Sequence, residues 1–148
     1  MKTNFTLTVF FALFSLMIFP TLLSQSKPDG WEDGSKFNKL FDTSTVDTVL
    51  GEVVQVDNIS PLKGMEIGVR VLVKIKNVII PIFIAPYWFA KHLNITIRPL
   101  DQIEVTGSFV RLDGKAIILA SRVVCNGIIL QLRNDKGLPI WECMRQLL

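Results

Sequence analysis

Hydrophobic residues recur at every second position over most of the chain from Thr45 onward, which is the spacing of β-strands. The clearest run covers residues 65–76, where six apolar residues alternate with mostly polar ones. This run predicts a long strand with one buried and one solvated face. Residues 45–59 also alternate, but the phase slips between Gly51 and Val54. A glycine beside a phase slip predicts a bulge or sharp bend in this first strand.

Four further alternating runs predict strands at residues 78–84, 102–110, 115–125 and 128–133. Asp113-Gly114 and Asn126-Gly127 separate consecutive runs, and these dipeptides are typical of two-residue hairpin turns. The alternation stops after Pro86, where Trp88, Phe89 and Leu93 have roughly helical spacing. Proline is pre-organised for a helix start, so we expect a short helix between the third and fourth strands.

Three strands, a short helix, two more strands and an extra hairpin strand follow the layout of the OB fold. We therefore predict a mostly β chain, with an OB-like five- to six-stranded barrel over residues 45–141. Closure of the barrel removes the exposed edges that so many apolar strands would otherwise leave. Trp88 or Phe89 is expected to plug the bottom of the barrel, with Tyr87 as the exposed aromatic residue. Trp141 is expected to pack across an open end.

The first 26 residues have the pattern of a secretory signal. Lys2 precedes an apolar run at 7–19, Pro20 ends the run, and Ser24-Gln25-Ser26 supplies small residues for cleavage. The alternative is an uncleaved anchor, because residues 5–23 are just long enough to span a bilayer. Either interpretation places the remainder outside the cytoplasm, as a periplasmic or secreted protein, with membrane contact only if the segment stays attached.

The two ends of the remaining chain carry little β pattern. Residues 27–35 are polar and rich in glycine and aspartate, which is typical of a linker. Phe37, Leu40 and Phe41 then recur at helical spacing and predict a helix of one or two turns. Residues 27–44 are thus interpreted as a linker with a short helix, and residues 142–148 as a C-terminal tail.

Composition excludes several classes of site. Sixteen Lys and Arg against thirteen Asp and Glu give a net charge of only +3, too small an excess to imply nucleic acid. Cys125 and Cys143 are either a disulfide, worth about 3 kcal/mol in the chain-entropy model, or two separate thiols. We favour separate thiols, because a chain of this size buries a sufficient core without a staple. Two cysteines and His92 are too few for a structural zinc site.

Nothing in the sequence predicts an enzyme or a cofactor. His92 has no nearby nucleophile or carboxylate, the acidic residues are scattered, and a glycine-rich phosphate loop is absent. We therefore expect a non-enzymatic binding or adaptor module of the cell envelope, which docks a protein or peptide partner on one face of the barrel.

The candidate binding face lies on the second and third strands. Arg70, Lys74 and Lys76 share the solvated side of the second strand, Phe83 is expected beside them, and Tyr87 follows. An alternative ligand for this face is an anionic small molecule or an oligonucleotide, which OB barrels bind across these strands. The simpler alternative is an ordinary solvated strand surface whose lysines discourage edge pairing. Nucleic acid is unlikely, because stacking aromatic residues are lacking on the second strand.

Several segments resemble a family of small exported bacterial proteins related to the magnetosome-associated proteins of the MamS and MamX type. The matching stretches are FNKLFDTSTVDTVLGEVVQV, PLKGMEIGVRVLVK, APYWFAKH, DQIEVTGS, DGKAIILASRV and LQLRNDKGLPIW. They extend from Phe37 to Trp141. The resemblance implies an OB-like fold in the periplasm or at its membranes and, for most members, no assigned biochemical activity. The haem-attachment motif Cys-x-x-Cys-His of some relatives is absent from this chain.

Overall fold

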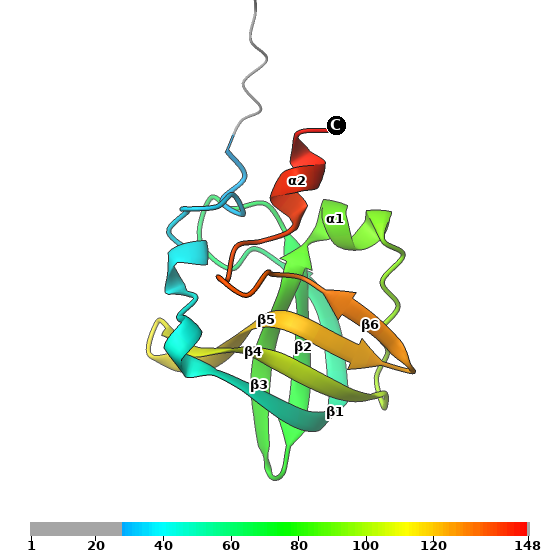
Figure 1. The fold of residues 1–148 in the computed structure, drawn as a ribbon. Coiled ribbons are helices and arrows are strands. Elements are labelled where there is room, and N and C mark those ends of the chain that lie inside the picture. The colour runs from blue at the N-terminus through cyan, green and yellow to red at the C-terminus, as the bar shows by residue number, and fades with distance from the viewer. Residues whose placement is uncertain (1–27, 148) are drawn as a thin grey trace, which may run out of the picture.

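The computed structural model describes residues 28–147 and shows a closed β-barrel with one extra strand (Figure 1). The sheet order is β3-β2-β1-β4-β5-β6, and a parallel pairing of β3 with β5 closes the first five strands into the barrel. The strands are β1 Val46–Ile59, β2 Gly68–Ile75, β3 Val78–Pro86, β4 Gln102–Leu112, β5 Lys115–Cys125 and β6 Ile128–Gln131. The predicted mostly β, OB-like barrel is confirmed, whereas the predicted signal segment lies outside the described residues.

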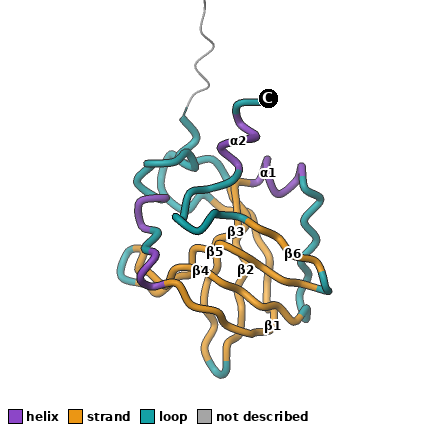
Figure 2. The backbone as a smooth tube through the Cα atoms, viewed as in Figure 1, coloured by secondary structure: helices purple, strands orange, loops and turns teal. Residues whose placement is uncertain are grey.

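The helices are short and lie outside the barrel wall (Figure 2). They are α1 Tyr87–His92, α2 Trp141–Arg145 and two 3-10 turns, η1 Asn38–Leu40 and η2 Thr43–Thr45. Helix α1 lies between β3 and β4, as predicted. The helix expected near Phe37 is a 3-10 turn, and the C-terminal tail contains α2.

Strand β1 serves two neighbours because it bends where the sequence pattern slips. Its first half pairs with β4 and its second half with β2, and the β1–β2 register shifts between Val53 and Gln55. This confirms the predicted bulge. The hairpin turns are confirmed too, since Asp113, Gly114, Asn126 and Gly127 all have positive φ, between 49° and 77°. Positive φ at both central residues is the geometry of the type I′ turn that matches strand twist.

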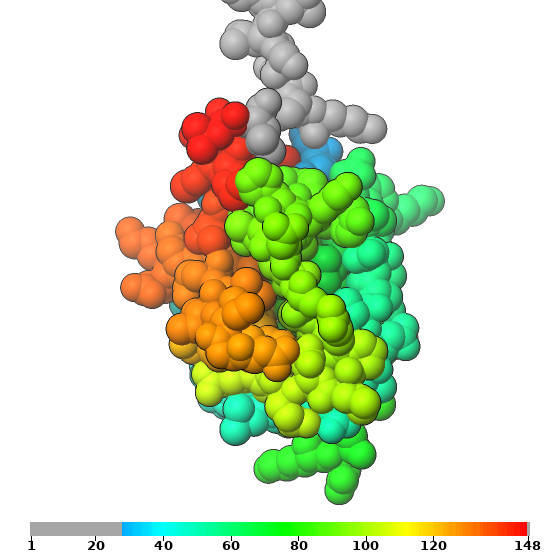
Figure 3. Space-filling model, turned by 90° about the vertical axis from the view of Figure 1, so that its right-hand side faces the viewer, coloured from blue at the N-terminus to red at the C-terminus, as the bar shows by residue number. Residues whose placement is uncertain are grey.

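Alternate residues of β2 fill the barrel. Val69, Val71 and Val73 are buried, as the period-two pattern predicts. Phe89 of α1 is 1% exposed, belongs to the same core cluster and packs on the Trp141 ring, while Trp88 is only half-buried and Tyr87 is exposed. Figure 3 shows α1, the segment after it and β6 meeting on one side of the molecule.

The segment that composition marks as a linker packs into the core instead. Trp31 is 1% exposed, and its ring meets Phe37 and Trp141 edge-on at centroid distances of 5.1 and 6.0 Å. The Trp31 indole N–H donates to the carbonyl of Glu66 at 2.9 Å. Gly68 faces this ring, and a Cβ at that position would overlap with it. Trp141 is fully buried here, as expected for a residue that covers an end of the barrel.

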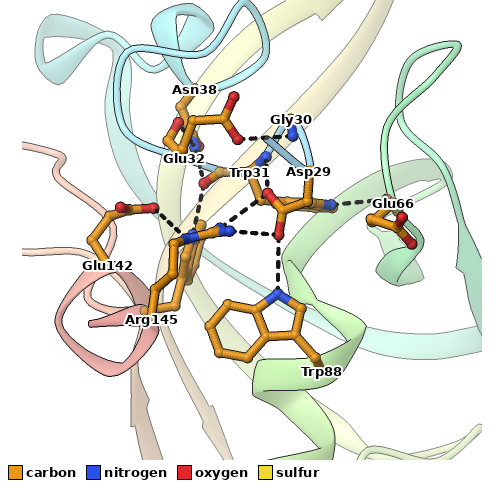
Figure 4. Close-up of polar contacts among 10 residues, drawn as sticks. Asp29, Gly30, Trp31, Glu32, Asn38, Glu66, Trp88, Glu142 and Arg145 are labelled. Carbon is orange, nitrogen blue, oxygen red and sulfur yellow. Dashed lines mark hydrogen bonds and ion pairs between the residues drawn. The ribbon is translucent and has the colours of Figure 1, made fainter. Parts of the chain in front are cut away.

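A buried carboxylate joins both ends of the chain to α1 (Figure 4). Asp29 forms an ion pair with Arg145 of α2, with Nη1 and Oδ2 2.9 Å apart. The same carboxylate accepts hydrogen bonds from the Trp31 backbone N–H at 2.8 Å and from the Trp88 indole at 3.2 Å. We call Asp29, Trp31, Trp88 and Arg145 the terminal network. It fixes α1, and therefore the surface around α1, against the barrel.

The protonation of Asp29 reflects two opposed effects. Burial raises the pKa of the carboxyl group, but hydrogen bonds from Arg145, Trp31 and Trp88, together with the charge of Arg145, outweigh burial. The pKa therefore lies below its ordinary value of 3.8. A carboxyl whose pKa is lower in the folded state stabilises the fold above its unfolded pKa. That stabilisation is lost as the pH falls through the folded pKa.

Replacing Trp31→Ala is expected to lower the free energy of unfolding by about 3–5 kcal/mol, because a large buried ring leaves a cavity. Urea denaturation followed by circular dichroism measures this. The matched control is Leu100→Ala, since Leu100 is 77% exposed and its loss should cost less than about 0.5 kcal/mol. Equal midpoints for the two variants would show that residues 28–35 are a linker after all.

Asp29→Asn is expected to destabilise the fold by about 3 kcal/mol at pH 7, because it leaves the half-buried Arg145 without its partner carboxylate. The difference from the unsubstituted protein should shrink as the pH falls from about 3.8 through the lower folded-state pKa of Asp29, where the native carboxyl becomes protonated. Denaturant titrations between pH 7 and pH 2 test this, with the exposed Asp47→Asn as control. A difference that stays constant down to pH 2 would contradict the assignment.

Candidate functional site

The structure does not assemble the basic face that the sequence suggests. Arg70 is held by Asp57, its register partner on β1, through Nε–Oδ1 and Nη2–Oδ2 hydrogen bonds of 3.0 and 2.7 Å. The hydrogen bonds and charge of this pair lower the pKa of Asp57 and raise that of Arg70 against the opposing effect of burial. A guanidinium bound in this bidentate way has few donors left for an anionic ligand.

The other residues of that face are separated by the length of the β2–β3 hairpin. Lys74 and Lys76 are exposed near the turn, where Ile75 pairs with Val78. Tyr87 lies just beyond the opposite end, where Gly68 pairs with Pro86, and is 37% exposed. A single ligand contact with the lysines and the tyrosine would have to span the whole hairpin.

Phe83 lies in the core instead of beside the basic residues. It is 5% exposed, and its ring meets that of Phe37 edge-on at 5.4 Å. Residues 82–86 of β3 are buried without alternation, because the barrel covers one side of the strand and the N-terminal segment covers the other. A strand with both faces covered does not follow the period-two rule by which Phe83 was assigned to the surface.

Strand β6 leaves one edge of the sheet unpaired. Strand β6 pairs with β5 on one side and is the last strand of the sheet order. Leu132 donates its N–H to the carbonyl of Ser121 on β5 at 2.8 Å. Backbone groups of an antiparallel strand face the partner at alternate residues, so those of Ile129 and Gln131 face outward. These two N–H groups therefore lie outside the β5–β6 ladder, and neither makes one of the other backbone hydrogen bonds found within residues 28–147.

Beside this edge lies a hollow that we call the β6 groove. Its volume is about 310 Å³, and it runs between β6 and the segment that follows α1. Its apolar wall consists of Leu93, Ile95, Ile128 and Leu130, and its polar residues include Arg98 and Asp101. Ile128 and Ile129 are 63% and 58% exposed, so the strand presents apolar side chains on both of its faces. An unpaired, apolar strand edge is a template for another strand.

A second hollow adjoins the β6 groove. It measures about 380 Å³, contains Tyr87 and Lys91, and shares residues 94–96 with the β6 groove as a common wall. Tyr87 therefore lies on the same side of the molecule as the free strand edge, away from Lys74 and Lys76. Of the predicted candidate residues, it is the one that belongs to this surface.

The cysteines are separate thiols, as expected. Cys125 is buried next to the β6 groove and Cys143 is exposed on α2, and both are free. Burial raises the pKa of the Cys125 thiol, and the charge and hydrogen bond of Asp101, whose Oδ2 lies 3.5 Å from Sγ, raise it further. A thiol kept neutral in this way is a weak nucleophile.

Residues 28–147 contain no cluster of three or more His, Cys, Asp or Glu side chains that could hold a metal ion. Among the same residues, none of the helices has the length and apolar character needed to cross a bilayer.

Sequence reasoning missed the free edge for an identifiable reason. The run Ile128-Ile129-Leu130 predicts an extra hairpin strand after the fifth strand, and closure of the barrel is expected to remove exposed edges. The signal that points to an edge is the position of this strand. It is short, it follows the fifth strand through a tight turn, and no alternating run comes after it to cover its outer side.

Comparison with known proteins places the chain in a family. The model of the MamS/MamX magnetosome protein family matches residues 45–130. This stretch covers more than half of the chain and extends from the start of β1 into β6, so it contains the complete barrel and most of the free edge. No curated protein matches the chain. The chain belongs to the MamS/MamX magnetosome protein family.

Proposed function

We propose that this protein is a non-enzymatic binding module of the cell envelope, which docks an extended segment of a partner protein along β6. The observation that carries the proposal is the outward-facing backbone of Ile129 and Gln131 beside the β6 groove. An added strand gains affinity from main-chain hydrogen bonds and specificity from pockets that receive alternate side chains.

The β6 groove favours one kind of segment. Its wall is apolar at Leu93, Ile95, Ile128 and Leu130, so an incoming strand would place apolar side chains there. Burying one such side chain contributes about 1.5–3 kcal/mol. Arg98 and Asp101 at the rim supply one charge of each sign, which suits a segment with polar residues between its apolar ones. The partner is therefore inferred to expose an extended segment of alternating apolar and polar residues.

The location in the envelope rests on the N-terminal pattern of residues 1–26, which is typical of a secretory signal. Export places the barrel in the periplasm or outside the cell. A partner segment is then a part of another envelope protein, and contact with the membrane is expected only if the leader remains attached.

The alternative ligand, an anionic small molecule or oligonucleotide on the second and third strands, receives less support. Arg70 is occupied by Asp57, and Phe83 is buried. Single-stranded nucleic acid needs aromatic side chains on which bases stack. Lys74 and Lys76 have no exposed aromatic neighbour among the candidate residues, since Tyr87 lies at the opposite end of the hairpin. Arg70 lies nearer to that end, but its guanidinium is bound to Asp57.

The test substitutes a photo-crosslinking amino acid at Ile129 in the full chain expressed in its own envelope. We expect a specific adduct with a partner at Ile129 and none at Lys76, which lies in the β2–β3 turn. The adduct should map to an extended apolar segment of the partner. Adducts at Lys76 with none at Ile129 would favour the basic strand surface and contradict docking on β6.

A backbone variant separates edge pairing from side-chain contact. Ile129→Pro removes an outward N–H while leaving the β5–β6 ladder intact, so binding of the mapped segment should weaken about tenfold. Ile129→Ala keeps that N–H and serves as the matched control, with an expected loss of less than about threefold. Calorimetric titration with a synthetic peptide of the segment measures both. Equal affinities for the two variants would rule out strand addition.

A further inference from the structure

Arg133 is a buried cation that forms no ion pair with a carboxylate of the described residues. Its residue is 2% exposed, and the ion pairs within residues 28–147 do not include it. Burying a charge is costly unless it is paired and hydrogen-bonded. The arginine must therefore be compensated by other contacts or by a group that binds to it.

The contacts that the protein supplies are neutral and incomplete. Nη1 donates to the Gly137 carbonyl at 3.1 Å, and Nη2 donates to the Asn38 side-chain oxygen at 2.6 Å. The guanidinium carbon lies 4.9 Å from the ring centroid of Phe41 and 5.2 Å from that of Trp141. Nε is buried and has no hydrogen-bond partner in the described part of the chain. Burial lowers the pKa of Arg133 to about 10 against the opposing charge of Asp33, which forms no ion pair with it, so the side chain still carries its charge at neutral pH.

Arg133 borders a hollow of about 350 Å³ between η2, β5 and the loop after β6. The hollow has two arginines in its lining, Arg133 and Arg122, against one carboxylate, the exposed Asp135. Arg122 uses a single hydrogen bond of 3.2 Å for its ion pair with Glu104, which leaves most of its guanidinium donors unused among residues 28–147.

Further donors line the same hollow. The Asn134 side-chain oxygen accepts hydrogen bonds from the Lys136 and Leu138 backbone N–H groups, both at 3.0 Å. The amide nitrogen of Asn134 and the hydroxyl of Thr43 make no hydrogen bond within residues 28–147. Two cations, an amide and a hydroxyl are the groups that proteins use to hold carboxylate and phosphate oxygens.

We propose that this hollow binds a small oxyanion, the carboxylate or phosphate group of a low-molecular-weight ligand. The anion compensates Arg133 and takes hydrogen bonds from Arg122, Asn134 and Thr43. This site is separate from the free edge of β6, and it predicts ligand binding whether or not a partner strand docks there.

The test titrates the purified full chain with inorganic phosphate, sulfate and citrate, each against sodium chloride of equal ionic strength. A ligand that binds only the folded state raises the melting temperature in a saturable way. We expect saturable stabilisation by at least one oxyanion. A larger rise in melting temperature with phosphate and sulfate than with citrate indicates a phosphate-type ligand. A larger rise with citrate indicates a carboxylate ligand. Stabilisation no greater than that by chloride would overturn the proposal.

Substitutions in the lining of the hollow test whether the stabilisation by oxyanions comes from binding there. Arg122→Gln should weaken oxyanion affinity at least tenfold, and Asp135→Asn should strengthen it severalfold by removing a like charge. The matched control is Arg111→Gln, at an exposed arginine of the β4–β5 hairpin whose side chain, within residues 28–147, bonds to the Gly114 carbonyl alone, and its affinity should be unchanged. Arg133→Gln should abolish the response. If that variant fails to fold, the oxyanion affinities of Arg122→Gln and Asp135→Asn test the proposal. Unchanged affinity in both variants would show an adventitious ion only.

Discussion

The outer edge of β5 is divided between two strands, and this division leaves β6 with an unpaired edge. Strand β5 pairs with β4 along one side. On its other side, Ile118 and Leu119 pair with β3 and residues 122–125 pair with β6. The pairing with β3 closes the barrel, so β6 joins a sheet that is already complete. Its second edge therefore has no strand to meet, and the hollow between β6 and the segment after α1 is a consequence of that geometry.

A second constraint acts at the ends of the chain. Trp31 and Trp141 are 110 residues apart in sequence, yet the Trp141 indole donates to the Trp31 carbonyl at 2.8 Å. Asp29 and Arg145 add an ion pair to this contact. Because Asp29 also binds Trp88, the orientation of α1 depends on both ends. The wall of the β6 groove is thus held from outside the stretch that the family model matches.

Structural features that follow from local periodicity can be predicted from the sequence. Features that depend on contact between distant segments cannot. Alternation at 65–76 identifies Val69, Val71 and Val73 as core, and the dipeptide turns fix the last three strands in order. Trp31 is surrounded by polar residues in the sequence, so its sequence neighbours do not indicate that it is buried. Its burial depends on contact with the distant Trp141. Phe83 is misplaced because a strand covered on both faces does not alternate. Arg133 follows a strand and has the character of a solvated residue, and only the packing of Phe41 and Trp141 around it shows otherwise.

The first and last described residues leave the barrel at the same end, beside α1 and α2 and opposite the β2–β3 turn (Figure 1). A tether or fusion partner joined to either terminus therefore hangs from one pole of the molecule. The flank that carries β6 points sideways from that pole. A chain tethered on its N-terminal side would consequently keep this flank open to its surroundings, and surface immobilisation through a terminal tag presents it in the same way.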